Sequence, residues 1–138
     1  MEYLIGFVLA AAVCVFAMVS GFDRDRAFYP TTMIVIAAYY ILFAAMVGST
    51  PALTIESSVA GVFIVLAVAG FKKNLWLVAA ALCGHGVFDF FHHAFIQNPG
   101  VPVWWPGFCG SYDILAGIFL AVLLVRRPGL AAPVAFPQ

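Results

Sequence analysis

Five apolar stretches, each long enough to cross a lipid bilayer, constrain this chain more than any other feature of its sequence. They cover residues 3–20, 30–47, 51–70, 75–96 and 108–125. A helix rises about 1.5 Å per residue, so about 20 residues cross a hydrocarbon layer roughly 30 Å thick. Because 65% of the residues are apolar and 9% are charged, a soluble fold could not bury the apolar surface. The sequence therefore predicts an all-α integral membrane bundle of five transmembrane helices.

The positions of the basic residues predict how this bundle is oriented. All six lie in three connectors, as the pairs Arg24 and Arg26, Lys72 and Lys73, and Arg126 and Arg127. Five crossings place these connectors on one side of the membrane, which the positive-inside rule makes cytoplasmic. We expect the N-terminus outside, residues 1–127 as the bundle and residues 128–138 as a short cytoplasmic tail. The expected location is a membrane crossed several times, the plasma or inner membrane in a bacterium.

The composition and motifs exclude several classes of function. The formal net charge is zero and the basic residues form no patch, which argues against binding to nucleic acid. The three cysteines contain no CxxC pair. The chain also has no P-loop, dinucleotide-binding glycine pattern, HExxH or GxSxG motif. The alternating charges of residues 23–26 are expected to pair with one another in a solvated turn.

The fourth apolar stretch contains most of the residues that could carry chemistry. Four ionisable side chains share one face of the predicted helix, within an arc of about 100°. They are His85, Asp89, His92 and His93. Ionisable groups inside a bilayer are costly and usually face the bundle interior, so we expect this stripe to face the other helices.

Two further carboxylates should lie at a similar depth in the outer half of the bundle. Glu56 is near the outer end of the third stretch, and Asp113 is in the outer half of the fifth. Because every lysine and arginine is placed on the cytoplasmic side, only histidines can supply a cationic partner. The carboxylates are therefore protonated, paired with imidazolium, or bound to a metal cation.

Neutral histidine with carboxylate is a common ligand set for zinc and for non-haem iron or manganese. The predicted metal ligands are His85, Asp89, His92 and His93, with Glu56 and Asp113 as catalytic carboxylates. Adjacent histidines point about 100° apart, so His92 with His85, or His93 with Asp89, are the better geometric pairs. No thiol is obviously close, which disfavours copper(I), although Cys109 could lie near the outer surface.

Three functions are compatible with this pattern. The first is a metal site that opens to the outer face, where metal-activated water would attack a lipid-like ester or amide with Glu56 or Asp113 as general base. The neighbouring Ser57 and Ser58 have no nucleophile signature and are given no role. A fully closed site would instead indicate a structural or metal-handling role.

The second is an accessory or assembly subunit, packed against a partner membrane protein or a second copy, whose polar cluster only fixes helix packing. The third is a proton or ion relay. The inner half of the predicted bundle lacks ionisable residues, which argues against it.

Overall fold

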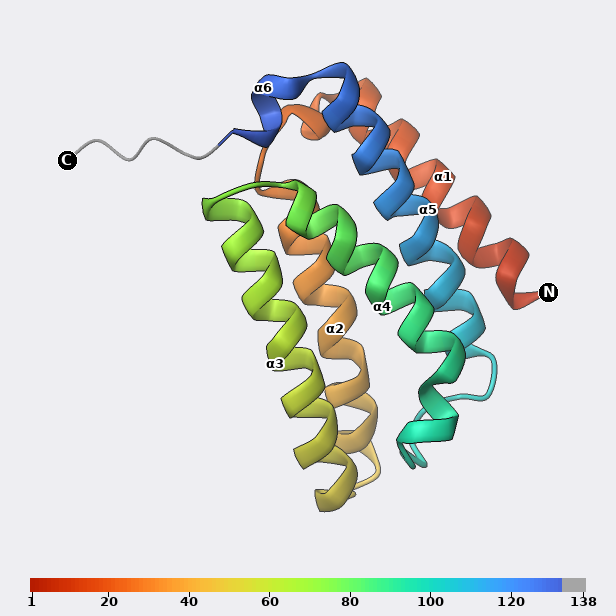
Figure 1. Ribbon diagram of the computed structural model, residues 1–138. Coiled ribbons are helices and arrows are strands. Elements are labelled where there is room, and N and C mark those ends of the chain that lie inside the picture. Colours follow the sequence, from red (N-terminus) through yellow and green to blue (C-terminus); the bar gives the residue numbers. More distant parts are fainter. Residues whose placement is uncertain (133–138) are drawn as a thin grey trace.

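The computed structural model describes residues 1–132, and these are almost entirely helical (Figure 1). In chain order the elements are α1 (Glu2–Ser20), the short 3-10 helix η1 (Phe22–Arg24), α2 (Phe28–Met46), α3 (Thr50–Lys72), α4 (Trp76–Phe95), α5 (Trp105–Arg126) and α6 (Pro128–Ala131). No strand occurs in this part of the chain. The all-α prediction is confirmed, and each long helix begins and ends within three residues of a predicted stretch.

Local chemistry explains where several of these helices begin and end. The backbone of Gly21 has a φ of +84° and that of Gly48 has a φ of +66°, a left-handed conformation that stops α1 and α2. The hydroxyl of Ser49 accepts a hydrogen bond from the Ala52 amide at 3.4 Å, and Pro51 follows in the first turn of α3.

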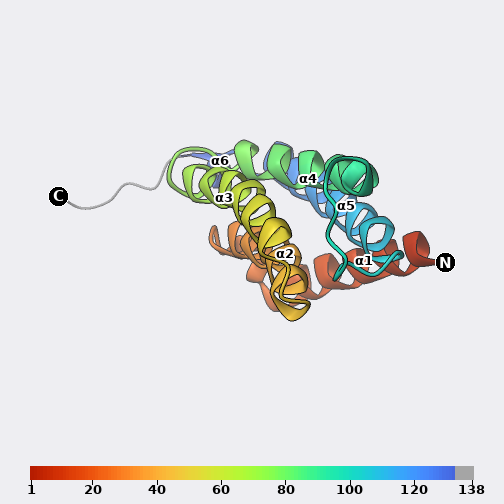
Figure 2. The same ribbon diagram turned by 90° about the horizontal axis from the view of Figure 1, so that it is seen from below.

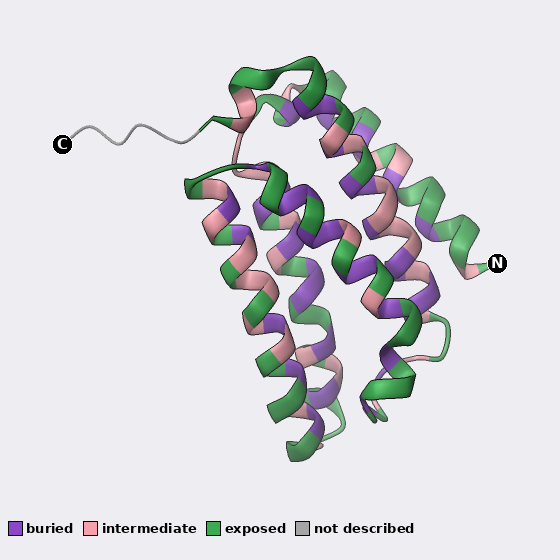
Figure 3. Cartoon of the chain, viewed as in Figure 1, coloured by how far each residue is buried: buried purple, intermediate pink, exposed green. Residues whose placement is uncertain are grey.

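The long helices form two groups that lean together (Figures 1 and 2). In the first group α5 packs against both α4 and α1, and in the second α2 packs against α3. Contacts of α4 with α3 and α2 join the groups, whereas α1 and α2 do not pack closely against each other. Figure 3 shows buried and exposed residues alternating along each helix, so every long helix has an inward face and an outward face.

The outward faces carry large apolar side chains, among them Val62, Val65 and Phe91. Four helices, α1, α2, α3 and α5, are long and apolar enough to cross a membrane. The 20-residue α4 is not among these four, because its three histidines and Asp89 lower its mean hydropathy. By length and composition the described chain therefore has the helices of a membrane protein.

The connectors that carry the basic residues meet at one end of the bundle. Arg127 donates a hydrogen bond to Asp23 at 2.7 Å, although only 1% of the Asp23 side chain is exposed. The Arg26 guanidinium donates to the carbonyls of Phe71 and Leu130. The prediction that residues 23–26 pair among themselves is therefore wrong, because these side chains tie the ends of α3 and α5 to the first connector.

The predicted tail of residues 128–138 falls partly in the described chain. Its first residues form α6, whose Leu130 carbonyl accepts the hydrogen bond from Arg26. Residues 133–138 lie outside the described residues.

Candidate metal centre

The candidate site is built where α4 and α5 come closest. A Cβ atom on Gly86 would lie 2.7 Å from the Gly110 carbonyl oxygen, and one on Gly110 would lie 2.8 Å from the Gly86 oxygen. Only glycine fits at such separations, so this pair sets how closely the two helices approach. Asp89 and Asp113 each follow one of these glycines by three residues. The close approach therefore brings the two carboxylates together.

Four side chains with metal-binding atoms converge beside this contact, and we refer to them as the His85 cluster. They are His85 and Asp89 of α4 and Cys109 and Asp113 of α5, and one donor atom of each lies within 4.8 Å of the others. His85 Nδ1 is 2.7 Å from Asp113 Oδ2 and 3.5 Å from Asp89 Oδ2. The Cys109 Sγ is 3.9 Å from Asp113 Oδ2.

The cluster is sealed from its surroundings. The exposed fraction is 0% for Asp113, 1% for Asp89, 2% for His85 and 3% for Cys109. Two carboxylate oxygens, Asp89 Oδ2 and Asp113 Oδ1, are buried and make no hydrogen bond within residues 1–132. A buried polar atom without a partner is costly, so both oxygens are available to a ligand at little loss.

The charges of the cluster do not balance. Asp89 and Asp113 carry two negative charges when ionised, and His85 can supply one positive charge. Every lysine and arginine of the chain lies in or beside one of the three connectors at one end of the bundle, at positions 24, 26, 72, 73, 126 and 127. When His85 binds as the neutral imidazole, a divalent cation would supply the positive charge that these acidic side chains lack.

A second group of polar residues, the Glu56 cluster, consists of Glu56, His92 and Asn98. His92 Nε2 is 2.9 Å from Glu56 Oε1, and Asn98 Nδ2 donates to the same oxygen at 2.9 Å. Asn98 Nδ2 also lies 3.1 Å from the Tyr40 carbonyl oxygen. Glu56 therefore has its own partners and is not a member of the His85 cluster.

Tyr40 of α2 connects the two clusters. Its hydroxyl donates a hydrogen bond to Asp89 Oδ1 at 2.8 Å. Its ring lies 4.4 Å from the ring of His92, measured between centroids. Tyr40 thus fixes one oxygen of Asp89, while the other, Oδ2, faces His85.

The structure brings together only part of the predicted site. His85, Asp89 and Asp113 meet in one cluster, whereas the predicted ligand His92 pairs with Glu56. The predicted ligand His93 is exposed and contributes to neither cluster. On a helical wheel His93 is at the edge of the stripe, about 80° from His85, which is why the packing that buries the stripe leaves it outside.

Sequence reasoning missed three residues of these clusters: Tyr40, Asn98 and the thiol of Cys109 as a direct neighbour of the carboxylates. Cys109 precedes Asp113 by four residues, so both lie on one face of α5, and this spacing was a usable signal. Tyr40 gave no such signal, because which residue of the Tyr39–Tyr40 pair faces inward depends on how α2 packs.

No protein-family model, no curated protein and no solved structure matches the chain. Its function is therefore argued from its own residues.

Proposed function

We propose that this protein crosses the membrane five times, with its N-terminus outside, and binds one divalent transition-metal ion in the His85 cluster. The observation that carries the proposal is the convergence of four metal-binding side chains within 4.8 Å, all buried. Two of the carboxylate oxygens there lack hydrogen-bond partners in the described chain. Polar packing alone would leave those two oxygens desolvated without compensation.

The five-span topology is supported by how α4 packs. Its ionisable side chains His85, Asp89 and His92 are buried against other helices, while Val87 and Phe90 are half exposed on the outward face. An apolar outward face and a polar inward face are what a spanning helix needs when it carries a site. The low mean hydropathy of α4 therefore reflects the site and does not exclude a crossing.

The donor set favours zinc. One imidazole, two carboxylates and one thiolate give four ligands of the kinds that Zn²⁺ binds tetrahedrally. Bond lengths of about 2.1 Å place tetrahedral donor atoms about 3.4 Å apart, so donor separations of up to 4.8 Å must contract by as much as about 1.4 Å. The 2.7 Å contact between His85 Nδ1 and Asp113 must in turn open, because the ion replaces the proton between them.

A closed, structural or metal-holding site agrees with the geometry better than the hydrolase hypothesis. A catalytic zinc keeps one position open for water, whereas the donors here are at most 3% exposed. Neither predicted general base is free, since Asp113 is a candidate ligand and Glu56 bonds His92 and Asn98. We therefore propose metal binding and assign no reaction.

Elemental analysis of detergent-purified protein tests this proposal. Wild type is expected to hold about one zinc ion per chain, and His85→Gln and Asp113→Asn are expected to lose it. The matched control is His93→Gln, which alters a histidine of the same helix that is exposed and outside the cluster. Size-exclusion chromatography shows which variants remain folded. If wild type contains no metal, or if His93→Gln loses as much zinc as the two cluster variants, the proposal is wrong and the polar cluster only packs the helices together.

A further inference from the structure

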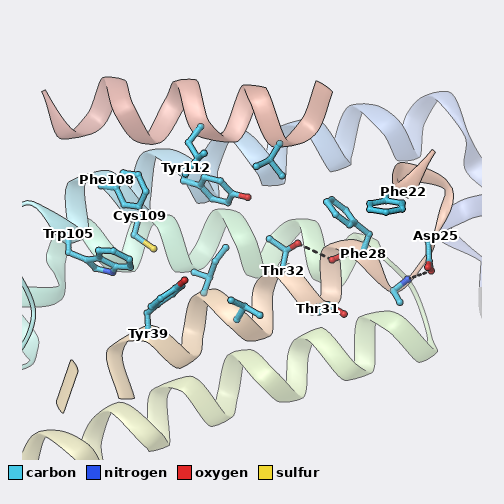
Figure 4. Close-up of a pocket in the computed structure, with 15 residues that line it drawn as sticks. Phe22, Asp25, Phe28, Thr31, Thr32, Tyr39, Trp105, Phe108, Cys109 and Tyr112 are labelled. Atoms are coloured by element: carbon cyan, nitrogen blue, oxygen red, sulfur yellow. Dashed lines mark hydrogen bonds between the residues drawn. The ribbon is translucent and has the colours of Figure 1, made fainter. Parts of the chain in front are cut away.

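A long apolar groove runs between α1 and α2, with α5 as its floor (Figure 4). Its volume is about 630 Å³. The middle of the groove is lined by Leu9 and Val13 of α1, Val35 and Ile36 of α2, and Cys109 and Tyr112 of α5. Such a volume is within the range of about 300–1,000 Å³ for pockets that bind small ligands.

The groove exists because its two walls pack on different partners. α1 rests on α5, and α2 rests on α3, so no close packing joins α1 to α2. Asp25 lies near one end of the groove and Trp105 near the other, and the hydroxyl groups of Thr32, Tyr39 and Tyr112 are spaced along the mostly apolar lining between them (Figure 4). The groove therefore presents a mostly apolar channel along most of the height of the bundle.

The mouth of the groove opens onto the apolar surface. Leu9 is 44% exposed and Val35 is 50% exposed, and both belong to the groove as well as to the outward faces of their helices. In a membrane-spanning bundle, the medium at this depth is hydrocarbon and not water. The acyl chains of lipids are therefore present at high concentration at the mouth of the groove.

The size of the groove argues against a protein helix as its occupant. A helix about 10 Å wide that crosses about 30 Å has a volume of roughly 2,400 Å³, so only a minor part of it could enter a groove of about 630 Å³. An acyl chain is much narrower than a helix. The volume and the apolar lining thus fit a chain of lipid better than a second copy or a partner helix.

We propose that this groove holds one acyl chain of a bilayer phospholipid, which lies against Cys109. Cys109 lines the groove and is also a member of the His85 cluster, so its side chain lies between the two. The inference requires no bound metal, because it depends on the shape and lining of the groove.

Photolabelling in vesicles tests the inference. The protein is reconstituted in phosphatidylcholine with a trace of phosphatidylcholine that carries a photoactivatable diazirine on one acyl chain, and labelled residues are mapped by mass spectrometry. We expect several-fold more labelling of the groove residues of α1 and α2 than of the outward face of α3. Val35→Trp fills the groove and should remove this excess.

The matched control is Val65→Trp, which places the same side chain on the outward face of α3, where Val65 is 66% exposed. It should leave labelling of the groove unchanged. Equal labelling of the groove and of α3, or no effect of Val35→Trp, would overturn the inference.

Zinc is measured in the same preparations, so the two proposals can fail separately. A zinc-loaded protein without excess labelling contradicts the acyl-chain site alone. A labelled groove in a metal-free wild type contradicts the metal site alone.

Discussion

At the scale of single residues, the site depends on which partner each of the two carboxylate oxygens of Asp89 has. Asp89 Oδ1 accepts the Tyr40 hydroxyl at 2.8 Å, which leaves Oδ2 directed at the cluster without a hydrogen bond in the described chain. Hydrogen bonds to the outer side of a ligand orient it toward the metal. Tyr40 is therefore the residue that positions Asp89.

We predict that Tyr40→Phe lowers the affinity for zinc by about 10–100-fold, the usual effect of losing a partner that orients a metal ligand. The variant keeps the ring that packs on His92 and removes only the hydroxyl. Competition with a chelating dye measures the change. Tyr39→Phe is the matched control, because Tyr39 is 38% exposed and lines the groove instead. Equal affinities of both variants and wild type would contradict the positioning role.

The sequence could predict His85, Asp89 and Asp113 as one site, because depth in the membrane and the distance from every basic residue depend only on position along the chain. It could not separate His92 from this site. Its pairing with Glu56 depends on the rotation of α3 and on where Asn98 folds back, and neither is encoded in a local pattern.

At the scale of helices, the Gly86–Gly110 contact decides whether the ligands from α4 and α5 can share an ion. The lengths of the apolar stretches and the polar connectors between them predicted where these helices begin and end. The sequence did not predict where α4 and α5 come closest to each other. Several glycines could form that contact equally well: Gly84, Gly86, Gly110 and Gly117. In the structure Gly86 packs against Gly110, Gly117 packs against Ala79 and Cys83 of α4, and Gly84 faces open space.

We predict that Gly86→Ala destabilises the fold by about 1–3 kcal/mol, because its Cβ would meet the Gly110 carbonyl and push the helices apart. The same displacement should lower the zinc content. Gly84→Ala, two residues away on the same helix, has no atom within 4 Å of the new Cβ, so it should keep the zinc content and stabilise the fold by up to about 1 kcal/mol, the usual gain for alanine over glycine in a helix. Unfolding in mixed detergent and elemental analysis measure both. A Gly86→Ala variant as stable and as zinc-rich as Gly84→Ala would show that this contact does not set the site.

At the scale of the whole molecule, the ends of the helices are tied together opposite the two loops that join α2 to α3 and α4 to α5 (Figure 1). The positive-inside rule required the three basic connectors to share one side, and the structure gathers them at one end. Charge counting did not show which side chains would pair there, because those contacts join residues far apart in the chain.

We predict that Arg127→Ala costs about 1–3 kcal/mol of stability, since it leaves the buried Asp23 carboxylate without its partner. Arg126→Ala removes an exposed neighbouring charge and should be close to neutral. Thermal unfolding of the two variants compares them directly. Equal losses would mean that the Asp23 pair adds nothing to stability.

Five crossings predict that the loop between α4 and α5 is outside. Val103, which is 89% exposed in that loop, provides the test as Val103→Cys. A membrane-impermeant maleimide should label it in intact cells and label Lys73→Cys only after permeabilisation. If α4 did not cross, both positions would be protected in intact cells.

X-ray absorption at the zinc edge of the purified protein tests the central claim, a metal held by the His85 cluster. Zinc in this cluster should have one sulfur ligand at about 2.3 Å and three nitrogen or oxygen ligands at about 2.0–2.2 Å. The sulfur contribution should disappear in Cys109→Ser. A zinc ion with no sulfur ligand, with more than one, or with a spectrum unchanged by Cys109→Ser would contradict the assignment.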